Sequence, residues 1–559
     1  YLLTTRFHLR PNQLFEISIY LLALLAFVAA TARHLLTLKS RRENSWPCPP
    51  IFIPLLKDQD HLQKAFSEKA VVLGYNVHGQ PWRWPDKVRV MQALLAGQSG
   101  AGKTTLLRNI ITQDVRRTAG TCQNPHHIPL IIFDGKGDQE FLSSLLPEIA
   151  AAGRMPQLRI LDPSRPGISV RYNPFYSKDD SYQERVNFIF ESFALREDFF
   201  HGHQATYLSD LARVLWHTSK RFNIHDVLVM ALDPQVMREQ IQEARYRVEH
   251  FSGISQQQRM NFEMSVHNLF QSFQDRERVP KIQGLLNELM TFLEDDLSII
   301  TGPYENLLTL DEIIDQELIL FVSLNVNRNS RAVTALGRML LQNLQLMVGK
   351  RYENERERRR EGRPMVSVIL DEFAPFAYPN FSQILQTARG TNTALLFSLQ
   401  SVSQLLTVSR GFRDDVSSGP NTIMLMRTRD EETAQYFLKA SSRITGKRRT
   451  LTVQETGLFQ KKYEEIGFGS ETEIRETRSH EEHIKNLPVG QMEILMTDNR
   501  LGTLHSHLHV RRSPEFHLPC MEPALYSRVT APNQLSQGAN LRFKDSGLAR
   551  RYPRISGRA

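Results

Sequence analysis

The chain has 559 residues, of which 41% are hydrophobic, and it carries a formal net charge of +9. This length and apolar content suffice for about three or four domain-sized units with a large core, so disorder is not the default expectation. The positive charge is compatible with a polyanionic partner or an anionic membrane surface, but it selects neither. The three cysteines lie far apart without CxxC spacing, so we expect no disulfide framework and a reducing compartment for most of the chain.

An apolar segment near the N-terminus predicts a transmembrane helix at residues 15–36, after a flank at 1–14. Its apolar core can span a bilayer of ~30 Å at about 1.5 Å per residue. Positive residues are more frequent after the segment than before it. This disfavours a signal peptide and places the following domains in the cytoplasm. A buried helix is the alternative. Because the sequence begins with Tyr1 rather than Met, we expect an earlier segment that could contain another span.

A glycine-rich loop with the sequence GQSGAGKTT follows a short apolar run and precedes a helical pattern. It fits G-x-x-x-x-G-K-[ST], in which backbone N–H groups surround phosphate oxygens at a helix N-terminus. We expect Lys103 to reach the β- and γ-phosphates of ATP and Thr104 to bind Mg²⁺. The flanking strand and helix disfavour the alternative, a surface turn. The predicted nucleotide-binding residues are Gly97, Gln98, Ser99, Gly100, Ala101, Gly102, Lys103, Thr104 and Thr105.

Strand-like runs alternate with helical stretches after a polar, proline-bearing linker at 37–70. Runs such as LIIFD, ELILFVSL, VSVILD and TALLFSL indicate an α/β fold with a buried parallel sheet covered on both faces. Residues 178–298 have helix-spaced apolar residues and few glycines, which predicts an inserted all-α domain. The α/β domain is therefore expected in two parts, 71–177 and 299–515, before a basic tail at 516–559.

Hydrolysis of a nucleotide needs a magnesium ligand and a base, and the sequence VSVILDEF offers both at the end of a predicted strand. We expect Asp371 to bind Mg²⁺ and Glu372 to polarise the attacking water. Gln400 ends the next strand, where its amide could sense the γ-phosphate or its water; a surface glutamine is the alternative. Arg389 could reach the γ-phosphate of a neighbouring subunit. Arg427 and Arg443 are less favoured for that role.

Three other features are open to more than one interpretation. The charged stretch at 350–363 is best read as a solvated helix end rather than a nucleic-acid contact. The basic residues at 541–559 fit either a mobile tail or a phosphate-binding arm. His505, His507 and His509 share one face of a predicted strand, but no carboxylate or cysteine partner is evident, which disfavours a zinc site.

The order and spacing of several motifs resemble the coupling-protein ATPases of type IV secretion and bacterial conjugation, the TraD/TraG/TrwB kind. The resemblance covers roughly residues 70–515 and rests on GQSGAGKT, IIFDGKGD, RYNPF, ILDEFAPF, ARGTNTALLFSLQSVSQL, NTIMLMRT and HIKNLPVGQMEILM. It implies a RecA-like motor anchored in the bacterial inner membrane, with its main domain in the cytoplasm and six copies around a channel. It also implies an all-α domain at the cytoplasmic mouth. Such proteins usually have two N-terminal spans, whereas one is visible here.

The resemblance further implies ATPase roles for Lys103, Thr104, Asp371, Glu372 and Gln400, with Arg389 acting in trans. Some relatives move relaxase-bound single-stranded DNA into the secretion channel, and others deliver protein effectors. Only about forty residues follow the motor here, which favours DNA. No base-reading motif is visible, so we expect binding without sequence preference. The alternatives are a receptor for protein substrates in which nucleotide controls assembly and, less favoured, a motor for chromosome segregation or pilus processing.

Overall fold

The computed structural model describes residues 19–32, 53–121, 124–176, 182–193, 195, 200–275, 277–293, 295–326, 330–353, 364–441, 443–456, 462–477, 479–498 and 502–513. Residues 19–32 form a helix whose side chains are all exposed. Within the described residues, no helix is both long and apolar enough to cross a membrane. The predicted span at 15–36 extends beyond this helix at both ends. The tail at 516–559 and most of the charged stretch at 350–363 lie outside the described residues.

The centre of the described structure is an 11-stranded sheet in the order β2-β1-β15-β14-β11-β3-β10-β9-β6-β8-β7. The run from β11 to β7 is parallel, which confirms the predicted parallel sheet. The run from β11 to β2 is antiparallel. The strands are β1 (Ala70–Tyr75), β2 (Pro81–Pro85), β3 (Ala93–Ala96), β6 (Leu130–Asp134), β7 (Leu158–Leu161), β8 (Ile319–Ser323), β9 (Val366–Asp371), β10 (Thr393–Leu399), β11 (Thr422–Leu425), β14 (Gln491–Asp498) and β15 (Gly502–Val510).

Helices cover both faces of this sheet, because successive residues of each central strand point to opposite sides. On β9, Ile369 belongs to the core under α5 and α6, whereas Val368 and Leu370 belong to the core under α15 and α17. The helices around the sheet are α3 (Leu55–Ser67), α4 (Asp86–Arg89), α5 (Lys103–Arg116), α6 (Gln139–Ala151), α15 (Ser330–Glu353), α17 (Phe381–Thr387), α18 (Arg410–Ser418), α19 (Glu431–Ala440) and α20 (Glu481–Lys485).

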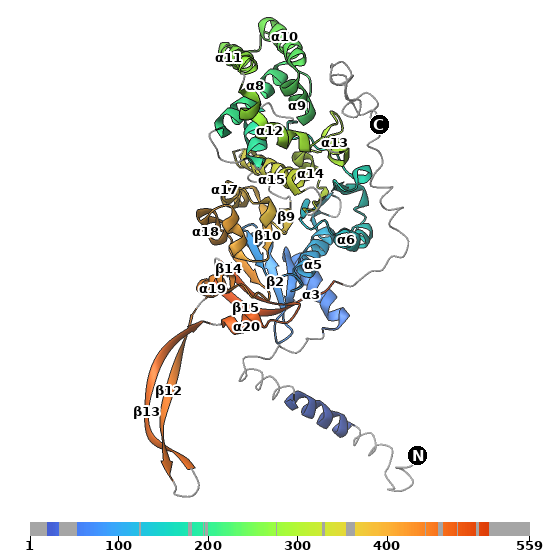
Figure 1. Cartoon of the computed structure of the whole chain (residues 1–559). Coiled ribbons are helices and arrows are strands. Elements are labelled where there is room, and N and C mark those ends of the chain that lie inside the picture. The colour runs from blue at the N-terminus through green and yellow to red at the C-terminus, as the bar shows by residue number, and fades with distance from the viewer. Residues whose placement is uncertain are drawn as a thin grey trace.

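A helical unit lies between β7 and β8 in the chain and forms one end of the molecule (Figure 1). Two of its helices begin with reciprocal capping boxes, Asn223 with Asp226 and Ser255 with Gln258, which satisfy otherwise unpaired backbone N–H groups. The unit shares a continuous apolar core with α15. Its helices are α7 (Tyr182–Ser192), α8 (His201–His217), α9 (Ile224–Leu232), α10 (Pro234–His250), α11 (Gln256–Gln274), α12 (Arg278–Thr291), α13 (Asp295–Thr301) and α14 (Leu310–Asp315).

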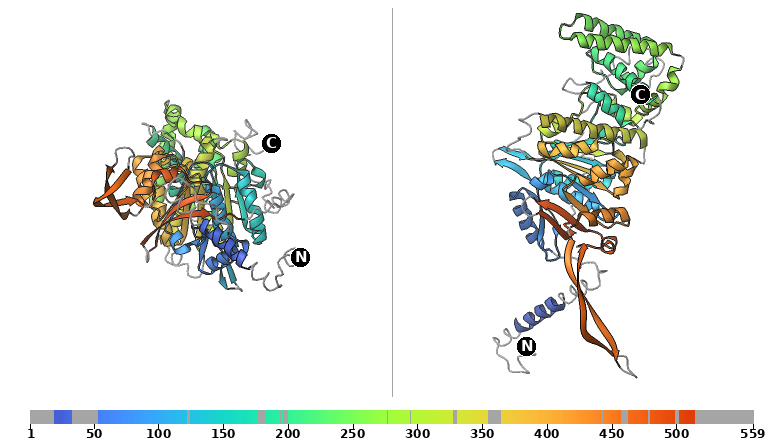
Figure 2. Two further views of the ribbon diagram at one scale, coloured as in Figure 1. Left: turned by 90° about the horizontal axis from the view of Figure 1, so that it is seen from below. Right: turned by 90° about the vertical axis from the view of Figure 1, so that its left-hand side faces the viewer.

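A long two-stranded hairpin extends from the opposite end of the molecule (Figure 2). Its strands are β12 (Arg443–Thr456) and β13 (Lys462–Thr477), which pair antiparallel and carry a register shift between Leu451 and Val453. It leaves the body after α19 and returns before α20. A shorter hairpin, β4 (Thr118–Thr121) with β5 (Asn124–His127), follows α5.

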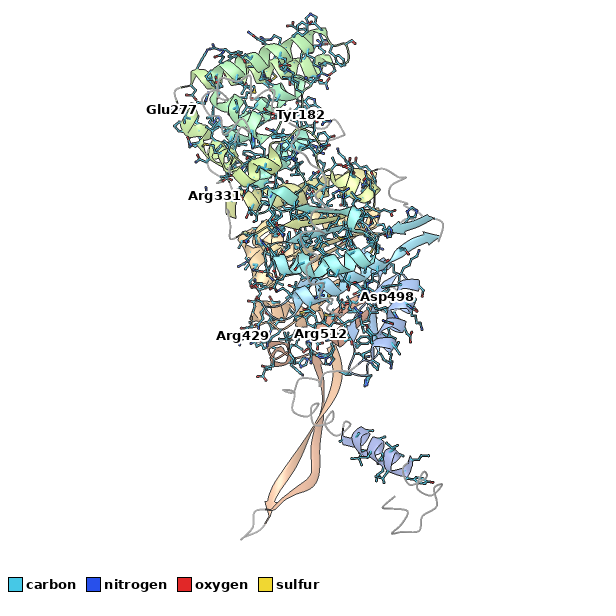
Figure 3. The ribbon with its side chains drawn as sticks, turned by 90° about the vertical axis from the view of Figure 1, so that its right-hand side faces the viewer. Tyr182, Glu277, Arg331, Arg429, Asp498 and Arg512 are labelled. Atoms are coloured by element: carbon cyan, nitrogen blue, oxygen red, sulfur yellow. The ribbon has the colours of Figure 1, made fainter. Side chains whose placement is uncertain are left out.

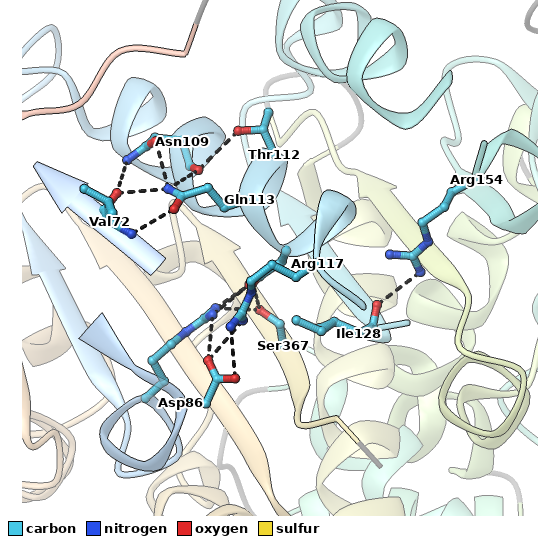
Figure 4. A network of polar contacts seen from close by, with 11 residues as sticks. Val72, Asp86, Asn109, Thr112, Gln113, Arg117, Ile128, Arg154 and Ser367 are labelled. Carbon is cyan, nitrogen blue, oxygen red and sulfur yellow. Dashed lines mark hydrogen bonds and ion pairs between the residues drawn. The ribbon is translucent and has the colours of Figure 1, made fainter. Parts of the chain in front are cut away.

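A buried ionic network holds the end of α5 against the sheet (Figure 4). Asp114 accepts hydrogen bonds from Arg89 at 2.6 and 2.7 Å, from Arg117 at 2.8 Å and from the Ser367 hydroxyl at 3.0 Å. Asp86 binds the outer side of Arg117 at 3.0 Å. Burial alone would raise the pKa of Asp114, but the two guanidinium groups lower it to about 2.

We predict that Asp114→Asn destabilises the protein by about 3–5 kcal/mol at neutral pH, because it removes the fully buried carboxylate that both guanidinium groups share and leaves them only the partly exposed Asp86. Since the folded-state pKa of about 2 lies below the unfolded value of about 3.9, the ionised carboxylate stabilises the fold above about pH 4. That contribution is lost as the pH falls toward 2. Denaturant titrations at several pH values measure this difference.

The matched control is Asp86→Asn, because the Asp86 side chain is 21% exposed and Arg117 keeps its bond to Asp114. We expect a much smaller loss for this variant. Equal losses for the two variants at neutral pH would contradict the assigned role of Asp114.

Candidate nucleotide-binding site

The glycine-rich loop joins β3 to α5 in the way its motif requires. Gly100 and Gly102 adopt φ values of +75° and +108°, in the left-handed region that glycine enters at little cost. A side chain at Gly97 would lie 2.9 Å from the Met426 side chain, whereas the space beside Gly100 is open. Ser99, Gly100 and Thr105 are exposed, so the outer surface of the loop can be reached by a ligand.

Lys103, the first residue of α5, is directed into this loop rather than toward solvent. It is 3% exposed, and its Nζ donates to the carbonyl oxygens of Gly97 at 2.5 Å and Gln98 at 3.4 Å. Burial lowers the pKa of Lys103, and the carboxylate of Glu372 opposes that shift. A buried cation therefore lies within the curve of backbone where the motif expects phosphate oxygens.

Asp371, at the end of β9, faces the first turn of α5. Its Oδ2 accepts from the Thr104 hydroxyl at 3.3 Å, and its Oδ1 accepts from the Ser398 hydroxyl of β10 at 2.6 Å. The carboxylate is 1% exposed. A carboxylate and a hydroxyl in contact are the hard oxygen ligands that Mg²⁺ prefers beside nucleotide phosphates. The residues predicted to bind the metal are thus adjacent in the structure.

Glu372 follows in an uncommon backbone conformation, with φ at +53°. Few non-glycine residues adopt this region, and such strain is typical of functional positions. The conformation is held by its N–H, which donates to Ser398 Oγ at 3.1 Å. Gln400 Nε2 donates to Glu372 Oε1 at 3.1 Å. The structure therefore brings together Lys103, Thr104, Asp371, Glu372 and Gln400 at one edge of the sheet.

The sequence interpretation assigned no role to Lys136, which the structure places in this site. Its Nζ lies 3.1 Å from Glu372 Oε1 and 4.0 Å from Asp371 Oδ2. Burial alone would lower the pKa of Lys136, but Asp371 and Glu372 raise it. The sequence feature that could have identified Lys136 is the turn Asp-Gly-Lys-Gly-Asp, which follows the apolar strand β6. The end of β6 lies beside the end of β9.

Asp134 is a second acidic group that the sequence interpretation did not assign. Burial raises the pKa of Asp134 to about 6, and the nearby charge of Asp371 adds to this rise. The backbone N–H groups of Lys136 and Asp138 donate to its carboxylate at 3.0 and 2.6 Å, which lowers the pKa in part. Asp134 lies directly opposite Asp371 in the register of β6 and β9. It shapes the turn that carries Lys136.

The three arginines that were weighed for a role in trans lie in different places, with Arg443 at the start of β12. Arg389 is exposed in a 3₁₀ turn, Ala388–Thr391, that precedes β10, whereas Gln400 follows the carboxyl end of that strand. Arg389 is therefore at the opposite edge of the sheet from Asp371 and Glu372 of its own chain. Arg427 follows β11 and lies beside the loop: its backbone oxygen accepts from Gln98 N at 2.9 Å. When the side-chain amide of Gln98 is rotated by 180°, its oxygen accepts a hydrogen bond from Arg427 Nε at 2.8 Å.

The structure corrects the expectation that the histidines of β15 lack a carboxylate partner. Glu493 on β14 lies within 3.0 Å of His483, 2.7 Å of His505 and 2.8 Å of His507. The sequence interpretation missed it because Glu493 belongs to a neighbouring strand and His483 to a separate helix, so only strand pairing brings them together.

Comparison with known proteins assigns the chain to a family. Residues 126–465 match the family model described as type IV secretory system conjugative DNA transfer. Because this match spans more than half of the 559 residues, the chain belongs to that family. This confirms the resemblance found in the motifs. A comparison with curated protein sequences finds no match.

Solved structures that match the chain include plasmid coupling protein TrwB with a non-hydrolysable ATP analogue, at 15% identity and a TM-score of 0.46, covering 82% of this chain and 94% of that one. TrwB with ADP and Mg²⁺ matches at 14% identity and a TM-score of 0.44, with coverages of 82% and 94%. VirB4 of Thermoanaerobacter pseudethanolicus matches at 14% identity and a TM-score of 0.45, covering 80% of this chain and 97% of that one.

The turn that carries Lys136 has no room for a side chain at Gly135. A Cβ there would lie 2.8 Å from the backbone oxygen of Glu372. We predict that Gly135→Ala destabilises the protein by about 1–3 kcal/mol through this overpacking. The control is Gly349→Ala, within α15, where a Cβ meets nothing within 4 Å and alanine favours the helix by up to about 1 kcal/mol. Denaturant titration compares the two. A Gly135→Ala variant more stable than the unmodified protein would show that the approach of Gly135 to the Glu372 backbone oxygen is not tight.

Proposed function

We propose that this protein is an ATPase of a type IV secretion system that uses ATP hydrolysis to move DNA into the conjugation channel. The observation that carries the proposal is the convergence of Lys103 and Thr104 on the glycine-rich loop with Asp371 and Glu372 at the neighbouring strand end. Membership of the conjugative DNA transfer family supports this choice of process. The related solved structures of TrwB contain an ATP analogue or ADP with Mg²⁺, the ligands proposed for this site.

The loop residues would hold the phosphates through backbone N–H groups, and Lys103 would contact the β- and γ-phosphates. Thr104 and Asp371 would bind Mg²⁺, since their oxygens are 3.3 Å apart. Bound Mg²⁺ would neutralise charge that develops on the phosphate oxygens. Ser398 fixes one oxygen of Asp371 with a hydrogen bond of 2.6 Å, leaving the other toward Thr104.

Glu372 would accept a proton from the attacking water or orient it, which is the role of a general base. Its carboxylate is held from two sides, by Gln400 Nε2 and by Lys136 Nζ, each at 3.1 Å. Arg389 lies away from this group in its own chain, and we propose that it completes the site of an adjacent copy. This requires a ring of subunits, which we propose to be a hexamer.

We further propose that the N-terminal segment anchors this ring in the bacterial inner membrane, with the main body in the cytoplasm. The cargo would be relaxase-bound single-stranded DNA, passed to the channel components of the secretion system. Such binding would be independent of sequence, through phosphates and stacked bases. The alternative is a receptor that delivers protein substrates and uses nucleotide only to control its assembly.

A cavity in the helical unit supports an anionic, base-bearing cargo. It has a volume of about 950 Å³, and its lining includes Tyr182, Trp216, Arg213 and Arg247. The rings of Tyr182 and Trp216 stack at 5.2 Å. Aromatic faces and guanidinium groups are the surfaces that bind single-stranded nucleic acid without sequence preference. Figure 3 places Tyr182 within the helical unit, far from Arg429 and Arg512 near the sheet.

The first prediction for this function concerns ATP hydrolysis by the purified full chain, with and without single-stranded DNA. We expect DNA to raise the rate, and Lys103→Ala and Glu372→Gln to lower it about 100-fold or more, because they remove phosphate stabilisation and the base. Matched controls are Lys64→Ala on α3 and Glu140→Gln on α6, both exposed positions, which we expect to leave the rate unchanged. A rate that ignores DNA would favour the protein-receptor alternative, and unchanged hydrolysis in both site variants would exclude this ATPase site.

A second prediction separates the pump from the receptor in cells. Glu372→Gln retains the loop and Lys103, so we expect it to bind ATP while DNA transfer stops. A receptor that uses nucleotide only for assembly would continue to deliver cargo in this variant. Transfer frequency, measured together with nucleotide binding by the purified variant, distinguishes the two.

A further inference from the structure

A cluster of histidine and glutamate side chains lies on the antiparallel part of the sheet and shares no residue with the nucleotide-binding site. Glu493 of β14 is paired with His507 of β15, so their side chains point to the same face. The third residue, His483, belongs to helix α20. One ligand atom from each of the three residues lies within 4.8 Å of both others.

The distances in this cluster are close to those of a coordinated dication. Glu493 Oε1 lies 3.0 Å from His483 Nε2 and 2.8 Å from His507 Nδ1. In a tetrahedral zinc site with bonds of about 2.0–2.1 Å, neighbouring ligand atoms are about 3.3 Å apart. Around such an ion the two contacts of Glu493 would lengthen by about 0.3–0.5 Å, and the nitrogens of His483 and His507, which lie within 4.8 Å of each other, would take up about the same spacing.

Neighbouring polar groups already orient the two residues on the strands. Gln491 Oε1 lies 2.9 Å from His507 Nε2, so a neutral His507 carries its proton on Nε2 and directs the Nδ1 lone pair at Glu493. A lone pair facing a carboxylate oxygen is favourable only when a proton or a cation lies between them. An imidazole whose second nitrogen is held by a neighbour is the usual arrangement of a metal-ligating histidine.

His505 has a different part in the cluster. Its Nε2 lies 2.7 Å from the other carboxylate oxygen, Glu493 Oε2, and its Nδ1 lies 3.1 Å from Ser441 Oγ. It therefore positions the carboxylate and leaves Oε1 for His483 and His507.

We propose that His483 Nε2, His507 Nδ1 and Glu493 Oε1 form a binding site for a first-row transition-metal dication, with Zn²⁺ the best fit. Two imidazoles and a carboxylate are a ligand set that Zn²⁺ accepts, with a fourth position for water. The set is distinct from the hard oxygen ligands Thr104 and Asp371, which suit Mg²⁺.

The position of the cluster gives such a metal a structural consequence. Ser441 immediately follows α19, before β12 begins, and α20 follows the end of β13. A metal bound by α20, β14 and β15 would fix the returning end of the long hairpin to the sheet. Through His505 and Ser441 it would also hold the point where the hairpin leaves.

The experiment is titration of the metal-free full chain with Co²⁺, which gives strong visible absorption only in a low-symmetry site with few ligands, followed by competition with Zn²⁺. We expect one equivalent of Co²⁺ to give this spectrum and Zn²⁺ to displace it. His483→Gln should weaken binding by about 100-fold or more, since it removes a direct ligand and second-shell losses alone cost up to about 100-fold. The His483 side chain is 36% exposed, so this variant keeps the buried packing.

The matched control is His480→Gln. His480 is an exposed histidine three residues earlier, and its side chain makes no capping hydrogen bond to α20. It should bind Co²⁺ as the unmodified chain does. A second readout is hydrogen exchange of residues 479–486, which Zn²⁺ should slow in the unmodified chain and not in His483→Gln. Absence of the spectrum in the unmodified chain, or equal binding by His483→Gln and His480→Gln, would overturn the proposal.

Discussion

The parallel pairing of β10 with β3 and β9, and of β9 with β6, is the constraint on which the rest of this structure depends. In this register Ala96 lies beside Leu399, and Asp134 beside Asp371. Since parallel strands end at a common edge, every turn that follows them is brought to the same place. The glycine-rich loop and the turns that carry Lys136, Glu372 and Gln400 are these turns. Residues separated by some three hundred positions in the chain thus form one site.

Charge balance within that edge follows from the same arrangement. A largely buried space at this edge contains two lysines and two carboxylates, from Lys103, Lys136, Asp371 and Glu372. Each cation limits the cost of burying the anions, and a phosphate chain would enter next to Lys103. The buried network of Asp114 with Arg89 and Arg117 plays a supporting part. It fixes the end of α5 against the sheet, and α5 in turn holds Lys103 and Thr104 at its first turn.

The two ends of the molecule differ in how they are joined to this sheet. The helical unit shares an apolar core with α15, so it packs on the body through many buried contacts. The long hairpin instead leaves the body between α19 and α20 and extends away from it (Figures 1 and 2). The helices at its root, α19 and α20, pack against β11 and β14 through an apolar cluster that includes Phe437, Ile484 and Leu495. The cluster of Glu493 with His483, His505 and His507 is located there.

Much of this architecture could be predicted from the sequence, because local patterns carry it. Apolar runs bounded by turns predicted the parallel strands, and the glycines before Lys103 predicted a strand–loop–helix that needs only adjacent residues. The family could also be recognised from the order of its motifs, and the comparison confirms it. The roles of Asp371, Glu372, Gln400 and Arg389 stay predictions, although the structure places the first three beside the loop.

Tertiary structure alone decided the rest. The turn that carries Lys136 can be recognised in the sequence, but its lysine enters the site only because β6 pairs with β9. The positive φ of Glu372 is maintained by a hydroxyl from another strand, Ser398. Glu493 meets His507 only through the antiparallel pairing of β14 with β15. Sequence by itself determined the parallel strands, the helical stretches and the phosphate-type loop, since those depend on neighbours in the chain, but it did not predict the long hairpin of β12 and β13. Which side chains meet was decided by strand order and register, which arise from burial over the whole sheet.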